Sequence, residues 1–484
     1  MNEGRSQFYF LQMVFLFVGA LLICFFSPVQ VDLELVGLAF VFIFLALVYF
    51  FYIRKRAGLS KHSFSLTMIF IFSYFIVFFQ FPLDLLLSSF SDNSLYNSLV
   101  YDESVLVESI WYLVCFFILL CLGMHRQVNR MLRFEGGGRN YKRVITKPFF
   151  YLFYLLFFMH LLTVDVGYYA GGRKGELTGL AGSILGYFVL LLPVCFGVVI
   201  YNSKVTESLG KVTVVDYVKL FPLPFTIILV LFSFITFLAG DRGPAIRTLI
   251  LLVFSYYIIS NTKVSNVKFI FIIIFAGFFL SVIKFIGAIN YNEDLIGSFL
   301  SAIERLNDSS KVESISPFTA ELSASFRAYN TSFSLWSSGY SLYGASVITG
   351  FLMSIPYGVS SFMQVFELSN EDINSAYTIT THVGEVYGLG TTVVGDSLLN
   401  VGFIPTLIMA YFMGRLFIKI DYTFFIKRNS VYIYTLGLYF LMNAVNLARG
   451  SIFPAIGNVI FISCLVFLIV SLFQKNKLVL SGAA

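Results

Sequence analysis

Charged residues are scarce in this chain. Asp, Glu, Lys and Arg make up 12% of the 484 residues, while apolar residues make up 58%. Soluble domains carry about 25% charged residues, so this composition excludes an ordinary water-soluble fold. The net charge of +6 comes from basic residues that lie between apolar runs. We therefore expect an integral membrane protein and no nucleic-acid partner.

Sequence motifs for nucleotide, metal and redox chemistry are also missing. The chain has no P-loop, no HExxH, no GxSxG and no dinucleotide fingerprint. The three glycines 136–138 lack the following Lys-Ser/Thr of a nucleotide site, and no Asp-x-Asp pair is present to hold a metal-bound nucleotide-sugar. All five cysteines fall in apolar runs without CxxC spacing. We expect no cofactor and no metal.

Apolar runs long enough to cross a bilayer recur along the whole chain. A helix needs about 20 mainly apolar residues to span the hydrocarbon, and about twelve runs qualify. We predict an all-α polytopic membrane protein in which residues 1–484 form a single integral membrane domain. The predicted spans are Gln7–Phe26, Leu35–Ile53, Phe64–Leu85, Val105–Met124, Phe149–Val166, Ser183–Tyr201, Pro222–Ala239, Pro244–Ser260, Phe269–Ile289, Thr391–Ile418, Val431–Leu447 and Ile452–Phe473.

Basic residues alternate with these spans. If the N-terminus is cytoplasmic, most of the 32 Lys and Arg residues fall in cytoplasmic segments, for example in 54–61 and 126–147. Cytoplasmic loops of membrane proteins are enriched in Lys and Arg. We predict that both termini are cytoplasmic and that the acidic stretch Asp92–Glu108 lies outside.

The segment 290–390, between the predicted ninth and tenth spans, is a large outer loop. It contains charges such as Glu293 and Arg305, but also apolar runs such as Ala345–Met353. Loops of this length without secondary structure are uncommon. We therefore expect helices that lie on the outer interface or dip into it.

Several cations remain on the outer side, where basic residues are usually depleted. Arginine at membrane depth is costly and usually faces a polar cavity, and its guanidinium matches phosphate oxygens in pairs. Arg242 also stands near a helix start, which favours an anion. The alternatives are that Arg242 pairs with Asp241, that Arg449 extends to the interface, and that the Gly-rich segment around Arg173 and Lys174 is a solvated turn. The candidate pyrophosphate- or sugar-binding residues are Arg242, Arg247, Arg449, Arg173, Lys174, Arg327 and Tyr377.

Carboxylates and one histidine near the end of the outer loop are the candidate proton acceptors. Asp396 stands one turn inside a predicted span, where a carboxylate is expensive and often functional. His382 and Glu385 precede it on a stretch rich in glycine. We expect nearby arginines to keep Asp396 ionised. The alternatives are that Asp396 anchors an arginine and that His382 only makes interfacial hydrogen bonds.

Short motifs in a particular order resemble those of the Wzy-type polysaccharide polymerases, which include O-antigen and enterobacterial common antigen polymerases. The number of spans and the late, large outer loop agree too, so the resemblance covers most of the chain, and Asp396 stands where many family members carry Glu. The matching stretches are 240–243 (GDRG), Trp336 through Tyr343-Gly344 to Ile355-Pro356, Asn374-Ser375, 388–392 (GLGTT), Gly395-Asp396, 400–402 (NVG) and 448–450 (ARG).

The resemblance implies a glycosyltransferase C-like fold in the bacterial inner membrane. It implies transfer of a growing glycan from undecaprenyl pyrophosphate onto a new lipid-linked repeat unit, for lipopolysaccharide or capsule biosynthesis. The flippase and a chain-length regulator of the same pathway would be partners. Two other functions remain open: an O-antigen ligase, which uses the same lipid donor, and a lipid-linked oligosaccharide flippase or other transporter. A transporter would usually show repeated halves, which this sequence lacks.

Overall fold

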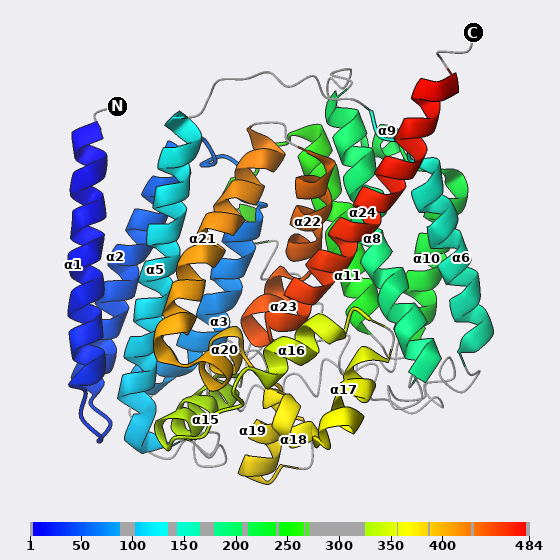
Figure 1. The fold of residues 1–484 in the computed structure, drawn as a ribbon. Helices are drawn as coiled ribbons and strands as arrows, with labels where there is room; N and C mark the ends of the chain where they lie inside the picture. The colour runs from blue at the N-terminus through cyan, green and yellow to red at the C-terminus, as the bar shows by residue number, and fades with distance from the viewer. Residues whose placement is uncertain are drawn as a thin grey trace, which may run out of the picture.

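The computed structural model of this chain is built from α-helices (Figure 1). It describes residues 3–87, 102–133, 143–164, 179–205, 212–238, 242–265, 268–269, 271, 325–355, 357–385, 388–426 and 430–480. Within these ranges no residue belongs to a strand, and an isolated parallel bridge joins His62 to Val264.

Eight helical segments in the described ranges are long and apolar enough to cross a membrane, so the chain is a multi-pass membrane protein. Their helices are α1 (Glu3–Phe25), α2 (Leu33–Arg56), α3 (Leu66–Leu87), α5 (Leu106–Arg133, after the 3₁₀ turn η1, Glu103–Val105), α8 (Gly179–Val205), α11 (Arg242–Ser260), α21 (Phe403–Phe425) and α24 (Phe453–Leu480). Shorter apolar helices are α6 (Lys147–Thr163), α10 (Leu223–Leu238) and α22 (Val431–Met442).

These helices account for the predicted spans with one exception. The predicted ninth span, Phe269–Ile289, lies almost wholly outside the described residues. The count of twelve therefore stays a prediction, while the all-α membrane architecture is confirmed.

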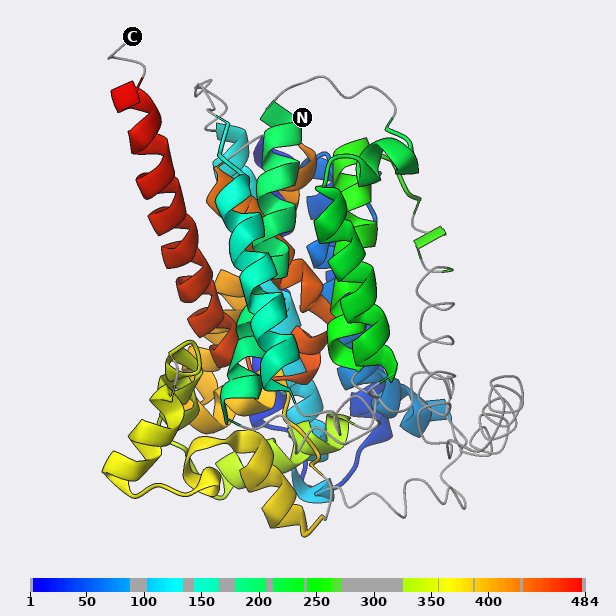
Figure 2. The same cartoon turned by 90° about the vertical axis from the view of Figure 1, so that its right-hand side faces the viewer.

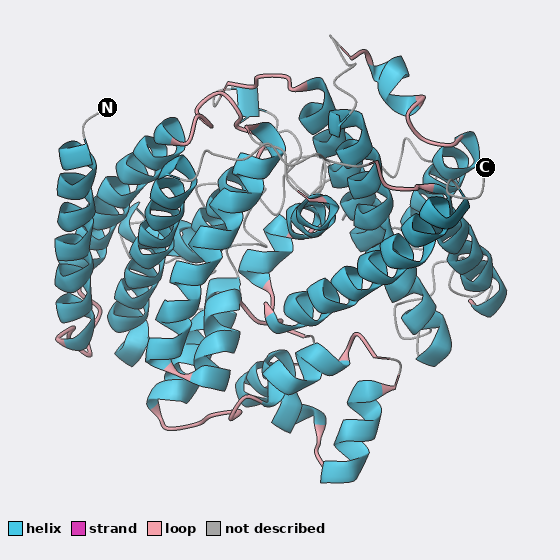
Figure 3. Cartoon of the chain, turned by 45° about the horizontal axis from the view of Figure 1, so that its top comes forward, coloured by secondary structure: helices cyan, strands magenta, loops and turns pink. Residues whose placement is uncertain are grey.

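The spans stand side by side, and α24 crosses the bundle obliquely (Figures 1 and 3). Both chain ends lie at one end of the bundle, together with α9 (Val214–Val218). A layer of short helices lies at the opposite end, as Figure 2 also shows. This layer contains α15 (Ser325–Ser337), α16 (Ala345–Leu352), α17 (Gly358–Phe366), α18 (Asn370–Ile373), α19 (Ser375–Val383) and α20 (Val393–Val401).

The closest contact between spans joins α5 to α21. A Cβ atom added at Gly123 would lie 1.9 Å from the carbonyl oxygen of Tyr411, and one added at Gly414 would lie 2.0 Å from that of Leu120. Small residues of this kind let membrane helices approach backbone to backbone. The pair holds α5, whose Trp111 and Tyr112 are fully buried, at the centre of the bundle.

A buried ion pair fixes the end of the bundle where the termini lie. Nη1 of Arg54 lies 3.7 Å from Oδ2 of Asp421, and both side chains are buried. Arg54 also donates to the carbonyl oxygens of Leu59 and His62, while the Asp421 carboxylate accepts the backbone N–H groups of Leu66 and Thr67. A buried charge needs such a full set of partners. The pair thereby joins α2, α3 and α21.

Two predicted spans are interrupted. The predicted tenth span, Thr391–Ile418, breaks at Gly402, whose φ of +83° is a conformation that favours glycine. Asp396 therefore lies on the short helix α20, and α21 crosses the membrane by itself. The predicted span Val431–Leu447 also ends early, at Met442, and after Asn443 the chain continues as α23 (Ala444–Arg449).

The outer layer is only partly interfacial. Phe326, Tyr329 and Phe333 of α15 are fully buried, and α15 packs against α3, α5 and α20. In contrast, α17 has no buried side chain. Helix α15 is thus part of the protein core, whereas the expectation of interfacial helices in 290–390 stays a prediction for α17.

Candidate functional site

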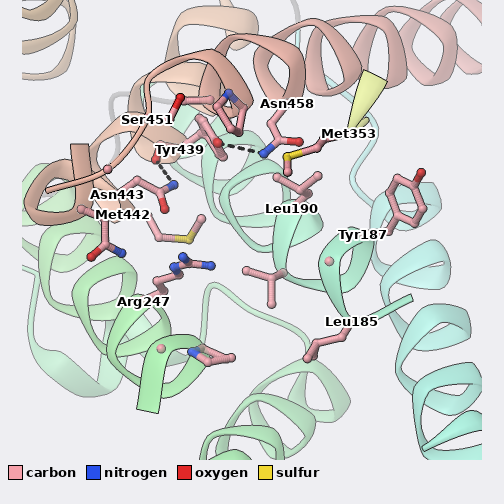
Figure 4. A pocket seen from close by; sticks show the side chains of 18 of the residues that line it. Leu185, Tyr187, Leu190, Arg247, Met353, Tyr439, Met442, Asn443, Ser451 and Asn458 are labelled. Carbon is pink, nitrogen blue, oxygen red and sulfur yellow. Dashed lines mark hydrogen bonds between the residues drawn. The ribbon is translucent and has the colours of Figure 1, made fainter. Parts of the chain in front are cut away.

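A cavity of about 730 Å³ lies between the span helices and the layer of short helices α15 to α20 (Figure 4). Its walls come from α8, α11, α22, α23, α24 and the residues that follow α16. Apolar side chains such as Leu185, Leu190 and Met353 line much of it. This is the size and mixed character of cavities that hold small molecules or parts of larger ones.

Arg247 is the one charged residue among the described residues that line this cavity. It lies in the second turn of α11, whose first turn contains Gly243 and Pro244. Proline is tolerated in a first turn, where its missing N–H would have no helical partner. The buried Nε of Arg247 has no hydrogen-bond partner among the described residues. The guanidinium thus has at least one donor that no described residue uses.

Neutral polar side chains form the wall near Arg247. Tyr439, Asn443 and Asn446 follow each other at helical spacing across α22 and α23, and Asn458 joins them from α24. Nδ2 of Asn458 donates to the Tyr439 hydroxyl at 3.1 Å, and Nδ2 of Asn443 donates to the Tyr439 carbonyl at 2.9 Å. Figure 4 shows Arg247 beside this wall. These bonds use the amide N–H groups, which leaves the amide oxygens of Asn443 and Asn458 as acceptors for ligand hydroxyls.

Asp396 lies behind this cavity, on α20. Its side chain is fully buried. Oδ1 accepts hydrogen bonds from Ser375 Oγ at 2.5 Å and from Asn400 Nδ2 at 3.0 Å. Oδ2 accepts no well-aligned hydrogen bond from the described residues, although the Ser451 side chain lies close enough to favour the ionised form. Because Ser451 itself lines the cavity, it connects the carboxyl group to the cavity.

Burial raises the pKa of Asp396 above its ordinary value of 3.8, although hydrogen bonds from Ser375, Ser451 and Asn400 oppose the shift. The expectation that neighbouring arginines would outweigh burial and lower this pKa is therefore wrong. No arginine forms an ion pair with Asp396 in the described part of the chain, so desolvation dominates. The alternative that Asp396 anchors an arginine also has no support among these residues.

Glu385 and Arg327 bind each other. Nη1 of Arg327 lies 2.8 Å from Oε1 of Glu385, and neither residue lines the cavity. His382 and Tyr377 are exposed on α19, and neither contacts Asp396 through a hydrogen bond found among the described residues. A relay from Asp396 through His382 is thus not formed in this structure.

The other predicted cations have different positions. Arg449 is partly buried and precedes Gly450 and Ser451, which both line the cavity. Arg242 begins α11, one turn before Arg247, and its side chain lies outside the described part. Arg173 and Lys174 also lie outside the described residues. Arg247 therefore lies at the same cavity as Gly450 and Ser451, the two residues that follow Arg449. The binding roles of Arg242, Arg173 and Lys174 stay predictions.

The sequence analysis missed Tyr439, Asn443 and Asn458. Their signal was present, because neutral amides within apolar helices are uncommon and usually face a partner or a cavity.

Comparison with models of protein families, with curated proteins and with solved structures finds no match to this chain.

Proposed function

We propose that this chain is a polysaccharide polymerase of the bacterial inner membrane. It transfers a growing glycan from undecaprenyl pyrophosphate onto a new lipid-linked repeat unit, on the outer side. The proposal includes about twelve spans, a glycosyltransferase C-like arrangement and cytoplasmic termini. The flippase and a chain-length regulator of the same pathway would be its partners.

The observation that carries this proposal is the cavity around Arg247. One arginine with an unused donor faces a wall of uncharged amides, and apolar side chains complete the lining. A lipid pyrophosphate that bears a sugar has three matching parts: an anion for the guanidinium, hydroxyls for the amides and an apolar chain. The cavity also lies at the end of the bundle opposite the termini, where the positive-inside rule predicts the outer face.

The reaction needs three contributions from the protein. A hydroxyl oxygen of the acceptor sugar forms a bond to the anomeric carbon of the donor glycan. The bond from that carbon to the pyrophosphate oxygen breaks, and lipid pyrophosphate leaves with the electron pair. Arg247 stabilises the charge on the leaving oxygens. The amides of Asn443 and Asn458 orient the sugar, and a base accepts the hydroxyl proton.

Asp396 is the base in this proposal, and it takes the proton through the Ser451 hydroxyl. Ser451 donates its own proton to the carboxylate while it receives one from the sugar. A carboxyl group whose pKa is raised by burial is a stronger base than an ordinary aspartate. Glu385 is a weaker candidate, because its carboxylate already accepts a hydrogen bond from Arg327.

The surface glycan of a strain that lacks this chain tests the proposal. A polymerase-deficient strain should carry single repeat units on its surface, and the wild-type gene should restore a ladder of lengths on a gel. Loss of a ligase would instead leave long polymer on the lipid carrier with none at the surface. Loss of a flippase would leave neither. Either of the last two patterns would refute the polymerase.

A further inference from the structure

The segment between Arg327 and Glu367 contains no charged residue. It includes α15, α16 and α17, and charges resume immediately afterwards with Glu367, Glu371 and Asp372. For α15 the reason is burial within the protein, as described above. Because α17 has no buried side chain, burial in the protein cannot be the reason there.

The composition of α17 is that of an interfacial helix. Val359, Phe362, Met363 and Phe366 recur at the spacing that forms one face of a helix, and Ser360, Ser361 and Gln364 lie on the other. On this stripe Phe366 is 62% exposed, and Val359, Phe362 and Met363 are half-buried. The rings of Phe362 and Phe366 pack together at 4.9 Å without a partner from another helix among the described residues. A stripe of this kind is typical of helices that bury one face in a lipid leaflet.

The neighbouring helix α16 fixes α17 at the level where the spans end. A Cβ atom at Gly457 of α24 would lie 2.2 Å from the carbonyl oxygen of Gly350, so α16 touches α24 backbone to backbone. The apolar window of α24 is only 17% buried, which leaves most of this span for lipid. The chain then turns at Tyr357, whose φ is +59°, and α17 lies apart from the spans (Figure 1). Helix α16 thus contacts both α24 and α17.

The residues between α16 and α17 are a thin wall of the cavity. Met353 and Ile355 both line the cavity, and each is 55% exposed. The Tyr187 hydroxyl of α8 donates to the Ser354 carbonyl at 3.1 Å, and the Tyr187 ring packs against Phe461 of α24. This segment therefore borders the cavity and is held to α8 by the bond from Tyr187.

We propose that α17 inserts its apolar stripe into the hydrocarbon of the adjoining lipid leaflet, and that Met353 and Ile355 are the wall of the cavity that faces this lipid. The partner of this surface is phospholipid. The uncharged apolar stripe disfavours aqueous solvent, and α16 connects α17 to α24, a span that is mostly unburied in the protein. The proposal does not depend on polymerase activity.

Quenching of tryptophan fluorescence by brominated phosphatidylcholine tests this proposal. The full chain is reconstituted in vesicles with and without bromine on the acyl chains, as the variants Phe366→Trp, Ile355→Trp and, as the matched control on the polar face of α17, Gln364→Trp. Bromine should quench Phe366→Trp and Ile355→Trp more than Gln364→Trp. An interfacial helix buries its apolar face by about 5–10 Å, so bromine near the glycerol end of the chain should quench most.

The unsubstituted protein gives the background from Trp111 and Trp336. Equal quenching of Phe366→Trp and Gln364→Trp would overturn the proposal, because the helix would have no lipid-facing side. Absence of quenching at both would also overturn it, and would indicate water or a second copy of this chain against the stripe. Quenching at Phe366→Trp without quenching at Ile355→Trp would support insertion of α17 into lipid. It would refute the proposal that Met353 and Ile355 face this lipid.

Discussion

Nη1 of Arg327 donates a hydrogen bond of 2.8 Å to Oε1 of Glu385, which joins α15 to the segment that follows α19. The arginine side chain is buried and that of the glutamate is 26% exposed. Each residue by itself was a candidate for the site, as a substrate cation and as a base. Together they neutralise each other away from the cavity, which gives them a structural role.

We expect Arg327→Ala to lower the stability of the protein. Loss of a hydrogen bond to a charged group costs about 1.5–3 kcal/mol, and partial exposure of Glu385 places the effect at the lower end. The double variant Arg327→Ala with Glu385→Ala should be less destabilised than the two single effects added together. Thermal unfolding in detergent measures both, and glycan ladders at matched protein amounts should keep their wild-type length. Shortened ladders at matched amounts would assign the pair to the reaction.

Asp396→Asn should abolish polymerisation and leave the protein folded. The amide keeps the size and most hydrogen bonds of the side chain but cannot accept the proton, so the rate should fall about 10²–10⁴-fold. Asp396→Glu should retain activity. Ladder length and melting temperature, measured on the same samples, separate a base from a structural residue. Full-length polymer from Asp396→Asn would remove Asp396 as the base.

The stability of the wild type should also depend on pH through Asp396. Since burial raises its pKa in the folded state above 3.8, the folded protein binds this proton more tightly than the unfolded chain does. The resulting stability is present below the ordinary value and is lost as the pH rises through the raised one. At neutral pH Asp396→Asn should therefore melt at the same temperature as the wild type or higher. A lower melting temperature at every pH would contradict the raised pKa.

Arg247→Ala should slow polymerisation by roughly a hundred- to a thousand-fold, as loss of one preorganised charged donor does. Arg247→Lys should recover part of the rate, because lysine keeps the charge and loses the paired geometry. Arg327→Ala is the matched control, since it removes an arginine of the same layer outside the cavity. Glycan ladders, measured at matched protein amounts, should show the highest activity for the wild type, an intermediate one for Arg247→Lys and the lowest for Arg247→Ala. Equal activities for Arg247→Ala and the wild type would remove the cavity from the proposed reaction.

Gly457→Ala should destabilise the contact between α16 and α24. The added methyl would lie 2.2 Å from the Gly350 carbonyl oxygen, so the helices must separate. Overpacking of this kind typically costs about 1–3 kcal/mol. Gly37→Ala on α2 is the control, because nothing lies within 4 Å of its added Cβ. Melting temperatures should fall for Gly457→Ala alone, and a fall of the same size in both variants would contradict the close contact.

The orientation of the chain can be tested by cysteine labelling. Tyr377 and Lys61 are both exposed; Tyr377 lies on α19 in the layer of short helices, and Lys61 follows α2 at the end of the bundle where the termini lie. In intact cells with a permeable outer membrane, a membrane-impermeant maleimide should label Tyr377→Cys and leave Lys61→Cys unlabelled until the inner membrane is opened. The reverse pattern would place the cavity on the cytoplasmic side and refute the proposed reaction there.

Span positions were predictable because apolar length alone determines them. Apolar runs at 1.5 Å per residue gave helices that the structure describes, from α1 to α24. The breaks at Gly402 and Asn443 were not predictable. A glycine within an apolar run is compatible with a continuous helix, and its φ of +83° depends on packing by residues distant in sequence, such as Trp336.

The site was only partly predictable for a related reason. Charge is easily noticed in an apolar sequence, so Arg247 and Asp396 were identified, and the amides of Asn443 and Asn458 were overlooked. The pKa shift of Asp396 was predicted with the wrong sign, because arginines were counted along the sequence. Only the fold shows that Ser375, Asn400 and Ser451 surround the carboxyl group, and that none of them is charged.

The ion pair between Arg54 and Asp421 has a consequence for biosynthesis. A ribosome adds about 5–20 residues per second, so α2 is complete tens of seconds before α21 appears. During that interval Asp421 is not yet present, and in the proposed orientation the charge of Arg54 would hold the end of α2 on the cytoplasmic side of the membrane. Once Asp421 arrives, the same guanidinium becomes buried and joins the first third of the chain to the last. In the proposed orientation, one residue thus serves first in membrane insertion and later in the stability of the finished protein.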